Sequence, residues 1–224
     1  MRKYLTVFLL IGLLVLPGEQ KADSATPKTY NFVAEIWVDN WFALYVSGKK
    51  IGEDSVPFST ERSFNSEKLF FKASFPFTVG VIARDFIENE SGLEYIGKPN
   101  QQIGDGGIIL QIRELSTGNV VAATNKSWKV FVTNRAPINE DCVKSSNPKQ
   151  DCENYIVKNP VSWSSAKFKD SNWKYATEFT EQQVGVKDGY FNFEWSPKAR
   201  LIWSSDLRID NTVLLRSTVL APKK

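Results

Sequence analysis

Four acidic residues close together in the sequence offer the clearest potential for chemistry. Asp85 follows a hydrophobic segment, and Glu88, Glu90 and Glu94 come soon after it. Two carboxyl groups across a cleft can hydrolyse a glycosidic bond, one as the acid and the other as the base or nucleophile. That reaction needs a defined separation, which sequence spacing does not set, and charged clusters are usually solvated loops. Pairing of Asp85 with one of the glutamates keeps glycoside hydrolysis as an alternative.

The chain contains no histidine, which removes most other routes to catalysis. Histidine is the base in Ser-His-Asp and Cys-His arrangements and a ligand in histidine-based zinc sites. We therefore expect no enzymatic activity and assign no catalytic residue. A binding protein is the expected class.

The elements that position these residues are strands, because segments rich in Val, Ile, Phe, Tyr and Trp recur between Gly, Pro, Asn and Asp. Residues 31–38 and 41–46 are expected to place alternate side chains on opposite faces. One face carries Phe32, Ala34, Ile36 and Val38, and the inward face of the second segment carries Phe42, Leu44 and Val46. Asp39-Asn40 is expected to join the two segments as a tight hairpin turn. A second turn leads into residues 49–52, so the chain is expected to open with a three-strand meander.

Further strands are expected along the rest of the chain. Pro76 interrupts the hydrophobic segment 70–83, which is expected to form two strand pieces or one bulged strand with the proline on an edge. Residues 108–112, 119–123 and 127–132 are expected to form two more hairpins. The last third is expected to contain strands at residues 191–195, 200–203 and 212–220.

The N-terminus predicts export. Arg2 and Lys3 precede an uncharged apolar segment, residues 4–16, which ends at Pro17-Gly18 and is too short to anchor a mature protein in a membrane. Residues 1–25 are therefore interpreted as a cleaved signal peptide. Residues 26–224 are expected to form one secreted domain, extracellular or periplasmic, without membrane insertion.

Residues 135–160 are polar, lack an apolar period and are expected to form a surface insertion. Cys142 and Cys152, the two cysteines of the chain, lie within it. An oxidising compartment would allow them to pair and close a short loop. We expect this disulfide to staple a loop and not the core.

The overall charge argues against a nucleic-acid partner. The chain has 28 basic and 25 acidic residues, so the mature protein is close to neutral. Its seven tryptophans are more informative, because a flat aromatic face suits a sugar ring. Most of them are nevertheless expected in the core.

Seven short segments carry motifs of a known kind, and together they span most of the mature chain. They are residues 38–40, 44–49, 106–109, 127–130, 168–173, 199–204 and 211–216. These motifs resemble those of galactose-binding-like jelly-roll sandwiches, as found in secreted carbohydrate-binding modules and in accessory domains of α-L-rhamnosidases. One departure is Ser47, where the family pattern has Asn. The resemblance implies an all-β jelly-roll fold, with Trp128, Trp173 and Trp203 packed in its core.

The resemblance also implies a non-catalytic module that binds a carbohydrate or a glycoprotein surface through loops at one edge. The candidate ligand-binding residues are Asp39, Asn40, Trp41, Arg84 and Asp85, although turn geometry and edge packing also explain them.

Two further properties stay open at this stage. Related sandwiches often hold a structural calcium, to which Asp85, Glu88 and Asp105 could contribute oxygen ligands, but no spacing singles out a metal site. The alternative to sugar binding is a structural or adhesive protein that self-associates or binds a partner protein.

Overall fold

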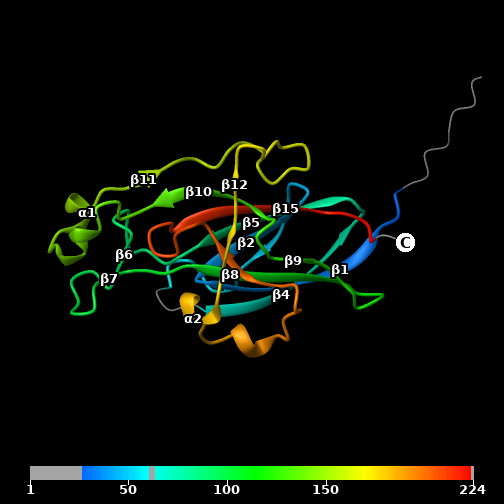
Figure 1. Ribbon diagram of the computed structural model, residues 1–224, viewed down its shortest axis with the longest axis horizontal. Coiled ribbons are helices and arrows are strands. Elements are labelled where there is room, and N and C mark those ends of the chain that lie inside the picture. Colours follow the sequence, from blue (N-terminus) through cyan, green and yellow to red (C-terminus); the bar gives the residue numbers. More distant parts are fainter. Residues whose placement is uncertain (1–26, 61–63, 223–224) are drawn as a thin grey trace, which may run out of the picture.

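The computed structural model describes residues 27–60 and 64–222, which form two antiparallel sheets packed face to face (Figure 1). In spatial order, the first sheet contains β13 (Thr177–Phe179), β14 (Leu201–Trp203), β8 (Gly107–Glu114), β1 (Tyr30–Asp39) and β4 (Phe64–Ala73), with β9 (Val120–Ala123) beside β8. The second contains β11 (Tyr155–Ile156), β10 (Lys129–Arg135), β15 (Thr212–Val219), β5 (Phe77–Arg84), β2 (Trp41–Val46) and β3 (Lys49–Glu53), with β12 (Lys174–Tyr175) beside β10. The expected all-β sandwich is confirmed.

The smaller elements lie outside the two sheets. They are the β6 (Leu93–Glu94) and β7 (Gln102–Ile103) pair, the short helices α1 (Pro148–Asp151) and α2 (Glu181–Val184), and the 3₁₀ turns η1 (Glu140–Lys144) and η2 (Tyr190–Asn192). The predicted signal peptide, residues 1–25, falls outside the described residues. In the described part of the chain, no helix is long and apolar enough to span a membrane.

The core lies between the sheets and follows the period-two alternation of the strands. The inward positions of β1 and β2 are fully or almost fully buried in one cluster: Phe32, Ala34, Ile36, Val38, Phe42, Leu44 and Val46. Successive strand residues point to opposite faces, so alternate apolar residues meet the same core. The inward face predicted for residues 41–46 is confirmed.

The junction between β1 and β2 is not the expected hairpin. β1 pairs with β4 and β8, whereas β2 pairs with β3 and β5. Asp39-Asn40 therefore carries the chain from one sheet to the other, and the predicted three-strand meander is wrong. Only its second half, the β2–β3 hairpin, is present. A hairpin and a crossover preserve the same alternation, which is why the pattern did not separate them.

Two other predicted pairings resolve in the same way. The β8–β9 hairpin is confirmed, but β10 lies in the opposite sheet and pairs with β15, so the second hairpin is wrong. The break at Pro76 does separate two strands, β4 and β5, and these also belong to different sheets. At both points the chain passes from one sheet to the other, where the sequence suggested a hairpin or an interrupted strand.

The strand predicted at residues 191–195 is absent, since η2 and an irregular segment occupy this region. Its aromatic side chains cover the outer face of the first sheet. Tyr190 meets Trp37 edge-on at 5.4 Å between ring centroids, and Trp195 lies 5.9 Å from Tyr190. The apolar composition that suggested a strand serves as a cover for Trp37.

The polar segment 135–160 is partly ordered by the expected disulfide. Cys142 and Cys152 are bonded, with 5.3 Å between their Cα atoms, and both are buried against Leu93 in a small cluster away from the main core. The segment also contributes a strand to the second sheet, because β11 lies in it and pairs with the end of β10.

The tryptophans expected in the interior are there. Trp128, Trp173 and Trp203 are all at most 4% exposed. Trp128 and Trp203 belong to the main core, while Trp173 packs with Trp163 on the outer face of the second sheet. None of the three presents an open face to a ligand.

Candidate functional site

The five candidate binding residues do gather at one place, the crossover from β1 to β2. The Asn40 amide donates to the Arg84 carbonyl at 2.9 Å, and Trp41 lies opposite Arg84 in the β2–β5 pairing. The Asn40 side-chain oxygen accepts from the Phe86 amide at 2.6 Å. The crossover thus ties the end of β5 to the start of β2.

Most of these residues are inaccessible to a large ligand. Asp39, Asn40 and Asp85 are at most 4% exposed. Trp41 and Arg84 are partly exposed and pack around Phe58, with the Arg84 guanidinium 4.3 Å from the ring centroid. Direct contact with a sugar is therefore open to Trp41 and Arg84 and closed to the other three.

An acidic cluster, formed by Asp39, Asp85, Glu94 and Asp105, lies at this end of the sandwich. Lys187 partly neutralises it, at 3.5 Å from Asp39 and 3.8 Å from Asp105. The pocket here has a volume of about 80 Å³, well below the roughly 300–1,000 Å³ of small-molecule sites. A saccharide ring does not fit into it.

Asp85 is the most unusual member of the acidic cluster. Neither of its carboxyl oxygens has a hydrogen-bond partner among the described residues, and they press against Gly104, where an added Cβ would lie 2.3 Å from Oδ2. Burial, and next the negative charge of Asp39, raise the pKa of Asp85 well above its usual range. Burial likewise raises the pKa of Asp39, against the effect of Lys187. Both shifts favour the uncharged acid.

The residues considered for hydrolysis and for calcium are only partly brought together, because Asp85, Glu94 and Asp105 belong to the acidic cluster whereas Glu88 and Glu90 do not. Glu88 and Glu90 are exposed, and Glu88 accepts from the Ile96 amide at 2.7 Å. Glu94 is buried and accepts from Gln102 at 2.9 Å. Across residues 27–60 and 64–222, no three His, Cys, Asp or Glu side chains are grouped to hold a metal ion. The arrangement does not fit calcium at Asp85, Glu88 and Asp105.

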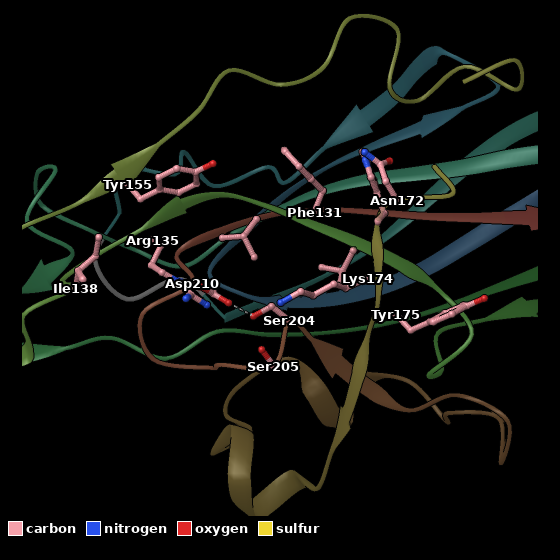
Figure 2. Close-up of a pocket in the computed structure, with 13 residues that line it drawn as sticks. Phe131, Arg135, Ile138, Tyr155, Asn172, Lys174, Tyr175, Ser204, Ser205 and Asp210 are labelled. Carbon is pink, nitrogen blue, oxygen red and sulfur yellow. Dashed lines mark hydrogen bonds and ion pairs between the residues drawn. The ribbon is translucent and has the colours of Figure 1, made fainter. Parts of the chain in front are cut away.

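A larger and more open site lies along the edge of the second sheet (Figure 2). β11 pairs with one end of β10 and β12 with the other, which leaves a gap along the middle of that strand. The gap is a groove of about 540 Å³, here called the β10 groove. Its principal lining residues are Phe131, Arg135, Tyr155, Lys174, Tyr175 and Asp210.

Two exposed tyrosines stand at opposite ends of the β10 groove (Figure 2). Tyr155 on β11 is 51% exposed and Tyr175 on β12 is 62% exposed. Between them, Phe131 stacks on the buried Trp173 at 5.3 Å between centroids. The Lys129 ammonium lies 3.6 Å from the Tyr175 ring centroid. The groove thus presents aromatic surface at both ends on an apolar floor.

A polar chain crosses the centre of the β10 groove. The fully buried Asp210 carboxylate accepts from Arg135 Nε and from Ser204 Oγ, each at 2.5 Å. The bond to Asp210 raises the pKa of Arg135. The Asp210 carbonyl accepts from the Trp203 indole at 2.8 Å. Both oxygens of Asp210 are therefore used to fix Arg135 and Ser204 in place.

The wall that carries β12 is positioned by Arg216 on β15. This guanidinium is 3% exposed and donates to Asp170 at 2.9 Å, to the Ser165 carbonyl at 3.1 Å and to the Phe168 carbonyl at 3.3 Å. It also donates to the Trp163 carbonyl. The chain from 163 to 170 has no strand of its own, so these bonds take the place of a sheet ladder.

Sequence reasoning did not identify the β10 groove. Tyr155 lay in a segment interpreted as an insertion, and Lys174 and Tyr175 follow a motif read for its core tryptophan. Exposed tyrosines in polar segments are a usable signal, because such rings lose apolar contact unless a ligand covers them. What sequence could not supply is that both segments dock on β10.

Comparisons with known proteins gave no match, since no family model, curated protein or solved structure corresponds to this chain. Function is therefore inferred from the two sites themselves.

Substituting Asp85 tests the state of the acidic cluster. A carboxyl with a raised folded-state pKa holds its proton more tightly when folded, so stability is full below the unfolded pKa and is lost as pH rises through the folded pKa. The loss per group reaches about 1.4 kcal/mol per pH unit. We expect Asp85→Asn to match wild type near pH 4, to be more stable at higher pH and to show a shallower pH slope, with Asp39 still titrating. Urea unfolding between pH 4 and 9 measures this, with the exposed Asp141→Asn as the control. An unchanged slope would show that Asp85 is not the titrating group.

Replacing Arg216 tests the support of β12. Arg216→Met leaves Asp170 and three carbonyls without their donor, and we expect a loss of about 3 kcal/mol, the lower end for breaking a buried pair because Asp170 is partly exposed. Arg200→Met removes an exposed arginine and should cost less than about 1 kcal/mol. Guanidinium unfolding compares the two variants. Equal losses would mean that Arg216 is not the support described here.

Proposed function

We propose that this protein is a secreted, non-catalytic carbohydrate-binding module and that its ligand occupies the β10 groove. The observation that carries the proposal is the pair of exposed tyrosines at the two ends of an open groove with a fixed polar centre. The volume of about 540 Å³ lies within the range of small-molecule sites and has room for a short saccharide.

The chemistry of the β10 groove suits a sugar. A pyranose ring has an apolar face that packs on an aromatic ring and a rim of hydroxyls that needs donors and acceptors. Tyr155 and Tyr175 offer the rings, while Asn172, Lys174 and Ser205 are exposed polar side chains in the lining. Arg135 is already oriented by Asp210, so it needs little ordering on binding.

The proposed family is that of the galactose-binding-like jelly rolls. In support, the similar motifs lie at or directly before strands of the sandwich: residues 106–109 lead into β8, 127–130 into β10, and 168–173 into β12. Export is supported by the apolar segment 4–16 and by the disulfide of Cys142 and Cys152, which an oxidising compartment favours.

The crossover at β1 and β2 is a second contact surface within this proposal. Trp41 and Arg84 are the two predicted residues with exposed surface there, and Phe58 beside them is half exposed. Asp39, Asn40 and Asp85 would act by holding this surface and not by touching the ligand. Self-association remains the alternative, through the exposed Phe70 on the edge strand β4.

A glycan array probed with the purified protein tests the proposal, with calcium and with chelator in parallel. We expect saturable binding to one class of glycan, equal in both conditions because no grouped metal ligands are present in the described residues. Silence across the array from folded protein, with a large species in sedimentation, would favour the self-associating alternative. Loss of binding under chelator would contradict the metal-independent site.

Truncating the groove tyrosines tests whether the ligand binds in the β10 groove. Tyr155→Ala and Tyr175→Ala each remove one aromatic platform, worth about 0.5–1.5 kcal/mol, so we expect each to weaken binding of the array-selected glycan about 3- to 10-fold. Phe70→Ala removes an aromatic ring that is 65% exposed on β4 and should leave affinity unchanged. Tryptophan-fluorescence titration provides the affinities, because Trp173 lies in the groove lining. Loss of affinity in Phe70→Ala alone would move the site away from β10.

A further inference from the structure

Some charged side chains of the β10 groove are paired within the fold and others are not, and what we infer from this difference rests on the proposed function. Three charged side chains line it: Arg135, Lys174 and Asp210. The negative charge of Asp210 is fully buried and engaged by Arg135 and Ser204. The accessible charge of the β10 groove is therefore positive.

Lys174 is the second cation in the groove lining, beside the paired Arg135. It is exposed on β12, and Figure 2 shows its side chain extending into the groove toward Ser204. Within the described residues its ammonium group forms no ion pair. A lysine that reaches into a groove without a partner is available to a ligand anion.

Lys129 adds a second positive charge at the same end. Its ammonium donates to the Trp173 carbonyl at 3.2 Å and lies over the Tyr175 ring. In the β10–β12 pairing Lys129 lies opposite Tyr175 and Val130 lies opposite Lys174. Lys129 therefore shares a face with Tyr175, whereas Lys174 extends from the other face of β12 into the groove (Figure 2). A sugar at this end of the groove would meet positive charge on both faces of β12.

The neighbouring carboxylates do not cancel this charge. Besides Asp210, Asp206 acts on the charge of Arg135, but Asp206 does not line the groove and its carboxylate accepts from the Arg208 and Ile209 amides of its own turn. Asp170 is bound to Arg216, and the acidic cluster around Asp39 does not line the groove. A neutral sugar would leave Lys174 unused, whereas an acidic sugar would pair with it.

We infer that the β10 groove takes an acidic saccharide, with its carboxylate or sulfate on Lys174. Both anions offer oxygens to an ammonium group, so the shared chemistry is an anionic substituent on a sugar ring. Hydrogen bonds to charged groups contribute about 1.5–3 kcal/mol, which corresponds to about tenfold or more in affinity.

The test uses pairs of probes that differ only in charge. One pair is a galacturonic acid trisaccharide and its methyl ester, and the other is a sulfated galactose trisaccharide and its desulfated form. Wild type should bind the acidic member of at least one pair about tenfold more tightly, and added NaCl should reduce this preference. Whichever pair shows it distinguishes a carboxylate ligand from a sulfate ligand.

Three lysine variants complete the design. Lys174→Gln should abolish the preference for the acidic probe, Lys174→Arg should retain it, and Lys72→Gln, at an exposed lysine on β4, should change nothing. The inference is overturned if wild type binds charged and neutral probes equally and Lys174→Gln does not change their affinity. If Tyr175→Ala still lowers the affinity in that case, the proposed function stays intact. No binding of any probe, together with a silent glycan array, overturns both.

Discussion

The buried guanidinium of Arg216 is the interaction on which the candidate binding groove depends. It extends from the outer face of β15, whose inner face belongs to the core, and binds the chain between Trp163 and Asp170 through four acceptors. That segment has no ladder of its own, and it leads directly into β12. An arginine is suited to this position because its planar fork serves several acceptors at once and stays charged when buried. Fixing this loop fixes one wall of the groove.

The second wall depends on an incomplete sheet edge. β10 is paired along one side with β15, but on its other side β11 and β12 cover only the two ends. An uncovered edge invites unwanted strand pairing, and natural sheets protect it with short neighbours and side chains. Here the disulfide-bonded segment returns as β11, and the loop held by Arg216 arrives as β12. The groove is the space that these two short strands leave between them.

The sequence patterns predicted which face of each strand is buried, but they did not predict which strands pair. The alternation in residues 31–38 and 41–46 correctly assigns Phe32, Ile36, Phe42 and Leu44 to one interior, since alternation reports which face is buried. It does not report the partner strand, which is why a crossover at Asp39-Asn40 was predicted as a turn. The groove was harder still, because Tyr155 and Tyr175 are brought together only by pairing with residues 20 or more positions away.

Two buried carboxylates show why burial alone did not identify the ligand site. Asp210 has a donor for each oxygen, so it is held in place and becomes a fixed part of the groove. Neither Asp85 oxygen accepts a hydrogen bond from another described side chain or amide, and burial makes its charged form unfavourable, as its raised pKa indicates; the carboxyl group lies against Gly104. In the sequence the two residues look the same, because each is an aspartate close to the end of a strand. The difference lies in whether an arginine and a serine from other segments reach the carboxylate, and it leaves exposed cations, not acids, to meet a ligand.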